Sequence, residues 1–141
     1  MLTTDQKAFL DRQRIARLST LEGDGTPQVL PVCYAAAETS IYITIDQKPK
    51  SGDPRKLKRL QNIRRNPKVA LVADHYDDDD WTQLHWLMVR GIAEILEDGL
   101  EHDQAQDLLR ARYPQYRRME LDDLPVIAIR ITEARGWSGT S

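Results

Sequence analysis

Disulfides and long apolar runs are missing from this sequence. Its one cysteine, Cys33, excludes an intramolecular disulfide and is typical of a reducing cytoplasm. No apolar stretch approaches the roughly 20 residues that a membrane-spanning helix needs. Residues 1–5 lack the basic and apolar regions of a signal peptide. These absences argue against a disulfide scaffold, a secreted protein and a membrane protein, so we expect a cytoplasmic location.

Motifs that carry catalysis are missing as well. The sequence has no nucleophile elbow, no phosphate-binding loop, no dinucleotide fingerprint and no cysteine cluster. His75, His85 and His102 match no metal-ligand spacing, so we expect structural or surface roles and no metal site. Cys33 sits in an apolar strand, and we expect it to fill space in the core rather than to act as a nucleophile. No catalytic residue is predicted, and if the protein is an enzyme, a bound cofactor supplies the chemistry.

What is present fits one globular domain spanning residues 1–141. Apolar residues make up 40% of the chain and charged residues 30%, which is ordinary for such a domain. The sequence pI near 5.9 argues against a general nucleic-acid binder.

Start and stop signals predict the helices. Thr3 and Gln6 have the spacing of a capping box, which predicts a helix over 4–12. Asp53 as cap and Pro54 at the first position predict a helix over 54–66, ended by Pro67. A third helix is expected from 98 to about 113, with Ala105, Leu108 and Leu109 facing inward.

Alternating and apolar runs predict at least six strands, at 15–21, 28–35, 41–46, 69–75, 83–96 and 125–132. Residues 41–46 alternate, which predicts one core face and one polar face. Pro31 favours an edge position or a bulge, and Gly91 favours a bulge or a bend. Because no crossover helices separate most strands, the chain should form a mainly antiparallel, six-stranded barrel.

Positive charge is concentrated in one segment. Residues 47–68 contain nine Lys or Arg and one acid, a local excess of +8 in a chain of net charge −2. On a helical wheel Leu57, Leu60 and Ile63 face the barrel, whereas Arg55, Lys58, Arg59 and Asn62 lie opposite. A face of this kind either contacts only solvent or holds an anion, such as a cofactor phosphate. The second interpretation gains donors from Thr44, Lys48, Lys50 and Ser51.

Two tryptophans flank a loop that begins with four consecutive aspartates. Trp86 is expected in the barrel core and Trp81 at its rim, although rings at a rim also stack on planar cofactors.

Several segments, taken in order, resemble one family. Residues 15–20 and 25–32, then 62–71, then the R-G-x-A-E strand at 89–95, are similar to the pyridoxamine 5′-phosphate oxidase-like flavin-binding split barrels. The closing run at 135–139 resembles one actinobacterial branch, the oxidoreductases that depend on the deazaflavin coenzyme F420.

The resemblance implies an FMN-binding split-barrel fold and a homodimer with two cofactor sites at the subunit interface. It implies that the cofactor ring contacts Pro31 and Val32, and that the phosphate is held by Thr44, Lys48, Lys50, Ser51, Lys58 and Arg59. Trp81 and Trp86 remain candidates for stacking on the ring.

Three functions are open at this point. The first is an F420-dependent oxidoreductase that transfers hydride to a small organic substrate. The second keeps the class but uses FMN, as pyridoxamine phosphate oxidases do. The third is a flavin-binding or carrier module without turnover.

Overall fold

The fold was analysed in a computed structural model, which describes residues 1–46 and 53–140. Its helices and strands, in chain order, are α1 (Thr4–Arg12), β1 (Ala16–Leu21), β2 (Pro27–Val32), β3 (Ala35–Ala36), β4 (Ser40–Thr44), α2 (Lys58–Arg65), β5 (Lys68–His75), β6 (His85–Leu96), α3 (Leu100–Arg112) and β7 (Val126–Ser138). Short 3₁₀ turns occur at Pro54–Lys56, Trp81–Gln83 and Pro114–Arg118.

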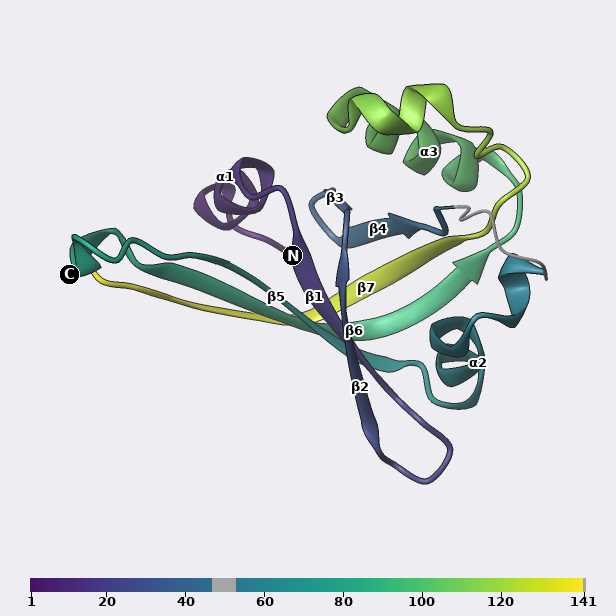
Figure 1. The fold of residues 1–141 in the computed structure, drawn as a ribbon, viewed down its shortest axis with the longest axis horizontal. Coiled ribbons are helices and arrows are strands. Elements are labelled where there is room, and N and C mark those ends of the chain that lie inside the picture. The colour runs from purple at the N-terminus through teal and green to yellow at the C-terminus, as the bar shows by residue number, and fades with distance from the viewer. Residues whose placement is uncertain (47–52, 141) are drawn as a thin grey trace.

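The strands form one antiparallel sheet in the order β2-β1-β5-β6-β7-β4-β3 (Figure 1). Its two edge strands, β2 and β3, are separated in sequence only by Cys33 and Tyr34. Because two residues span only about 7 Å, the edges must approach each other, and the sheet curls into a split barrel. The predicted β-barrel class is confirmed, with seven strands rather than six because β3 separates from β2.

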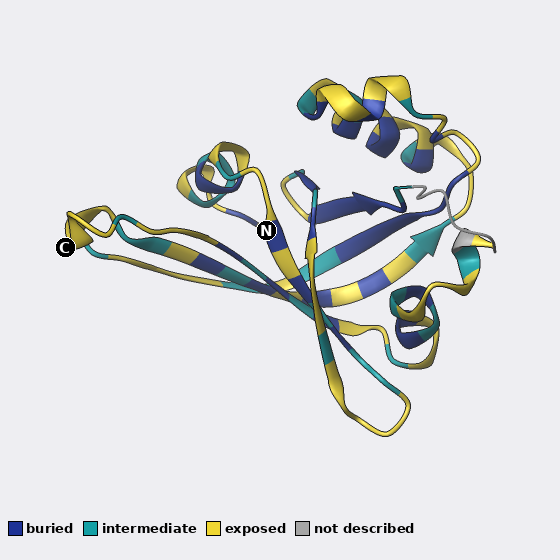
Figure 2. Ribbon diagram, in the orientation of Figure 1, coloured by how far each residue is buried: buried dark blue, intermediate teal, exposed yellow. Residues whose placement is uncertain are grey.

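The interior of the curled sheet is the main core. It contains Ile41, Ile43, Leu71, Leu87 and Ile127, each at most 1% exposed. The prediction that β4 has a polar outer face was wrong, since all five of its residues are buried (Figure 2). The reason is α3, which lies over that face and covers it.

The basic helix is shorter than predicted. Asp53 caps the 3₁₀ turn by accepting a hydrogen bond from the Arg55 backbone, but Leu57 is extended and separates this turn from α2. Leu57 is therefore 38% exposed rather than packed in the barrel. Asn62, expected on the solvent face, is fully buried and donates to Thr20 Oγ1 at 3.0 Å.

The long β6–β7 ribbon extends away from the barrel (Figure 1). The predicted bulge at Gly91 is confirmed, since pairing with β7 shifts between Arg90 and Gly91. A side chain at Gly91 would begin 2.4 Å from the carbonyl oxygen of Arg130, so no other residue fits there. β7 continues to Ser138, past the predicted end at Thr132, because the ribbon pairs along its whole length.

Helix α3 is fixed to the sheet by an ion pair. The Arg130 guanidinium on β7 donates two hydrogen bonds to the Glu101 carboxylate, at 2.5 and 2.8 Å, and Tyr42 Oη donates a third at 2.6 Å. Ala105 and Leu109 face inward as predicted, but Leu108 is 44% exposed. One side of α3 thus seals β4, and the other meets solvent.

A polar cluster closes the joint between the two sheet edges. Tyr34 is fully buried, and its hydroxyl donates to the Leu10 carbonyl at 2.6 Å. Arg112, at the end of α3, donates to the carbonyls of Tyr34, Leu10, Asp11 and Gln13. Tyr113 Oη accepts from the Tyr34 backbone N–H at 3.0 Å. These contacts connect α1, the β2–β3 joint and α3.

Arg112→Ala should lower the free energy of unfolding by about 3 kcal/mol, because it leaves several carbonyls around the joint without a charged donor. Chemical denaturation measures this value. Arg118→Ala is the control, since exposed Arg118 makes only one hydrogen bond within the described residues, to the Gln115 side chain. Equal stability of the two variants would show that the joint does not depend on Arg112.

Acid should weaken the attachment of α3. Hydrogen bonds from Arg130 and Tyr42 lower the pKa of Glu101 from 4.5 to about 2. A lowered pKa means that the ion pair stabilises the fold fully above about pH 4.5 and progressively less as the pH falls toward 2. The Glu101 side chain is 40% exposed and the Arg130 side chain 31%, so solvent screens the pair. Its contribution to the free energy of unfolding is therefore about 1 kcal/mol or less.

Glu101→Gln should therefore flatten the fall in stability between pH 5 and pH 2, as measured by denaturation at each pH. Glu94→Gln is the matched control. Glu94 accepts one hydrogen bond, from Nε of Arg130, and its side chain is 56% exposed. If both variants keep the slope of the parent, the ion pair is not a source of acid sensitivity.

Candidate functional site

Four of the predicted cofactor residues line one cleft. Pro31 and Val32 come from the end of edge strand β2, Thr44 from the end of β4 and Arg59 from the first turn of α2. The cleft has a volume of about 300 Å³, within the range of small-molecule sites. Ile15, Leu30, Cys33, Ile43, Asp46 and Tyr116 complete its lining. The curled sheet thus brings together residues that are far apart in sequence.

Thr44 is oriented by a residue that sequence reasoning missed. Thr44 is 2% exposed, and its Oγ1 accepts a hydrogen bond from Gln106 Nε2 at 3.0 Å. The same amide nitrogen donates to the Leu121 carbonyl at 2.9 Å, which fixes the amide's orientation. Because Oγ1 already accepts from Gln106, the hydroxyl proton of Thr44 is left to donate elsewhere.

The two adjacent cations of α2 differ in their surroundings. Arg59 is half-buried in the cleft, whereas Lys58 is exposed and lies 3.4 Å from the Glu22 carboxylate on the β1–β2 hairpin. Lys58 does not line the cleft. The structure therefore separates two residues that the sequence placed in one phosphate site.

Six lining residues were not predicted as part of the site, and three of them, Cys33, Asp46 and Tyr116, carry ionisable groups. Cys33 is only half-buried and lies between strands rather than within one, so its assignment as buried filling was wrong. Asp46 follows β4 and brings a carboxylate to the cleft. Burial raises the pKa of Tyr116, and the neighbouring Cys33 and Asp46 raise it further, so this phenol stays protonated as a donor. Tyr116 follows α3, and no local pattern connects it with β2.

The cleft continues into a neighbouring hollow of about 360 Å³, which shares Cys33, Asp46 and Tyr116. Its further lining is mostly apolar or aromatic, from Tyr113, Pro114, Gln115 and Met119. A polar end at Thr44 and Arg59 and a less polar continuation suit a ligand with an anionic group on a flat organic body.

Trp81 and Trp86 lie outside the cleft. Trp86 is 37% exposed and pairs directly with Trp137 on β7, so its expected place in the core was wrong. Trp81 is 65% exposed in the turn before β6. Lys48, Lys50 and Ser51 lie outside the described residues.

Within residues 1–46 and 53–140, no group of three His, Cys, Asp or Glu side chains is arranged to hold a metal ion. Over the same residues, no helix combines the length and apolar character that crossing a bilayer requires.

The sequence of the chain matches the family model described as pyridoxamine 5′-phosphate oxidase over residues 2–138. The chain therefore belongs to the pyridoxamine 5′-phosphate oxidase family, whose members typically bind flavin. No curated protein sequence matches it.

Solved structures agree with this fold. A conserved hypothetical protein from Mycobacterium tuberculosis is 22% identical with a TM-score of 0.79, covering 99% of this chain and 86% of its own. An F420 reductase is 25% identical with a TM-score of 0.64, and the match covers 95% of this chain and 98% of the reductase. A heme-binding protein from Mycobacterium smegmatis is 14% identical with a TM-score of 0.71, and the match covers 94% of this chain and 56% of the heme-binding protein. Proteins with this fold thus differ in what they bind.

Proposed function

We propose that the protein is an oxidoreductase that binds reduced coenzyme F420 in the cleft beside β2 and uses it to reduce a small organic substrate. The single observation that carries this proposal is the convergence of the β2 edge, Thr44 and Arg59 on one cleft. The similarity to an F420 reductase favours the deazaflavin over FMN. The bound cofactor would supply the hydride.

The residues of the cleft suit the two ends of such a cofactor. Arg59 offers a guanidinium to the phosphate, and Thr44 offers the hydroxyl proton left free by Gln106. Lys48, Lys50 and Ser51 remain proposed phosphate donors on the segment between β4 and α2. Pro31 and Val32 end β2, which among the described strands pairs only with β1, so backbone groups on its other edge are available to a ring.

Two alternative functions would use the same cleft. FMN has the same kind of ring and phosphate, and family membership agrees with it equally. A module that binds a cofactor without turnover agrees with the heme-binding structure, which has the same fold. Turnover assays with a panel of acceptors distinguish an enzyme from such a module.

Arg59→Ala should weaken cofactor binding by about tenfold or more, because a hydrogen bond to a charged group contributes about 1.5–3 kcal/mol. Fluorescence titration with F420 and with FMN measures the affinities and decides between the two cofactors. Lys58→Ala is the matched control, since it removes the adjacent cation of the same helix, which faces Glu22 instead. Thr44→Val should also weaken binding while preserving side-chain volume.

If Arg59→Ala binds both cofactors as tightly as Lys58→Ala and the parent, the basic helix face contacts only solvent. The cleft would then not be the phosphate site.

The assembly we propose is a homodimer formed through the β6–β7 ribbon. Trp86 and Trp137 are directly opposite each other and are 37% and 48% exposed, on a ribbon that extends from the body (Figure 2). Neighbouring exposed tryptophans mark a surface that other protein covers. A second copy would cover this pair and would bring its own ribbon, with Trp81 and Trp86, toward a neighbouring cleft.

Trp137→Glu should convert the dimer to a monomer at micromolar concentration, because a charge would replace a covered aromatic ring. Sedimentation velocity measures the mass. Leu108→Glu, at an exposed apolar position on α3, should leave the dimer intact. A parent protein that sediments as a monomer at this concentration would contradict the proposal.

A further inference from the structure

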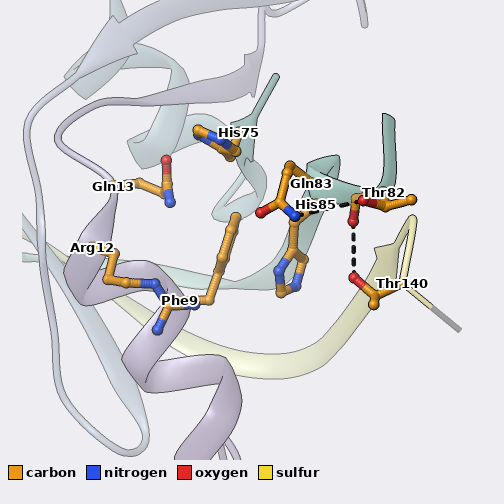
Figure 3. A pocket seen from close by; sticks show the side chains of 8 residues that line it. All are labelled: Phe9, Arg12, Gln13, His75, Thr82, Gln83, His85 and Thr140. Carbon is orange, nitrogen blue, oxygen red and sulfur yellow. Dashed lines mark hydrogen bonds between the residues drawn. The ribbon is translucent and has the colours of Figure 1, made fainter. Parts of the chain in front are cut away.

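A second pocket lies away from the cofactor cleft, between α1, the end of β5, the start of β6 and the C-terminal segment (Figure 3). Its volume is about 420 Å³, which suits a small organic molecule. It is lined by Phe9, Arg12, Gln13, His75, Thr82, Gln83, His85 and Thr140. None of these residues lines the proposed cofactor cleft.

The charged and titratable groups in this lining are all basic. Arg12 comes from the last turn of α1, and His75 and His85 are directly opposed partners in the β5–β6 register. Side chains of such partners lie on one face with Cβ atoms about 5 Å apart. The pocket therefore gathers a guanidinium and two imidazoles without an acid among its eight lining residues.

Five acids on the surrounding elements have other contacts, whereas the carboxylates of Asp5 and Asp79 have no described partner. Asp11 pairs with Lys7 at 2.8 Å, and Asp74 pairs with Arg17 at 3.1 Å. Asp80 accepts from the backbone and hydroxyl of Thr82. The Asp77 carboxylate accepts from the backbone N–H groups of Asp79 and Asp80, and Asp78 accepts from Tyr76 Oη. Arg12 makes no ion pair with any described residue.

The His85 ring is held in place before any ligand arrives. It stacks on Phe9 with ring centroids 3.8 Å apart (Figure 3), and Phe9 is 2% exposed. Burial lowers the pKa of His85, and the positive charges of Arg12 and His75 lower it further. Like charges that converge on a fixed ring disfavour protonation unless an anion joins them.

We propose that this pocket is a second binding site, which takes the carboxylate or phosphate group of a small organic molecule. Arg12 would pair with the oxyanion, and ring N–H groups of His75 and His85 would donate to it. Gln83, Thr82 and Thr140 offer neutral polar groups to the rest of the molecule. Its lining shares no residue with the cofactor cleft of the same chain, so anion binding at His85 can be measured separately from cofactor binding and turnover.

The test uses the whole protein with labelled histidines and follows both imidazoles by NMR. Inorganic phosphate and malonate are added in separate titrations, with ionic strength held constant by sodium chloride. Either anion should raise the pKa of His85, and affinity should increase as the pH falls from 8 to 6, because protonation of the His85 ring adds positive charge beside Arg12.

Arg12→Ala should weaken the binding of the effective anion by about tenfold or more. His75→Gln is a second variant on an exposed side chain and should weaken it as well. Arg90→Ala is the control, because Arg90 lies on β6, the strand of His85, but pairs with Glu133. A response to one anion alone identifies the class of ligand. If neither anion moves the His85 pKa, or if Arg12→Ala and Arg90→Ala bind equally, the proposal is overturned.

Discussion

The structure depends on how the two free edges of its sheet are held at the β2–β3 joint. Tyr34 lies at that joint, fully buried, and Arg112 reaches it from the end of α3. Buried carbonyl groups at such a joint need donors, because unpaired polar groups inside a protein are costly. The end of α1 joins the same cluster through the carbonyls of Leu10 and Gln13. A few polar contacts therefore position the strand end that borders the proposed cofactor cleft.

Helix α3 connects this joint with the chemistry of the cleft. Its first turn is fixed by Glu101 and Arg130, its middle supplies Gln106 to Thr44, and its last turn supplies Arg112. The Oε1 atom of Gln106 is buried without a described partner. The amide nitrogen of the same side chain is satisfied, because it donates to Thr44 and to the Leu121 carbonyl.

Local signals predicted much of the fold. The capping box at Thr3 and Gln6, the bulge at Gly91 and the edge strand around Pro31 follow from short-range stereochemistry, and all three are present. Pro31, Val32, Thr44 and Arg59 were expected together and share a cleft, although their role stays a prediction.

Long-range contacts account for what the sequence could not predict. The residue that orients Thr44, Gln106, is distant in sequence and looks like any polar residue of an amphipathic helix. The break at Leu57 and the exposure of Trp86 are likewise set by tertiary packing, which local propensity does not include. The preference for one flavin over another leaves no signature in the described lining.

The single extra residue at the bulge decides which side of the ribbon carries its aromatic rings. On β7, Ile127, Ile129 and Ile131 contribute to the core, whereas beyond the bulge Ala134 does. On β7 the residues that face the interior thus have odd numbers up to Ile131 and even numbers from Ala134 onward. On β6 the buried residues have odd numbers on both sides of the bulge. Without that change Arg135 and Trp137 would point toward the interior. An insertion or deletion of one residue here would therefore exchange the inner and outer faces of the whole distal strand.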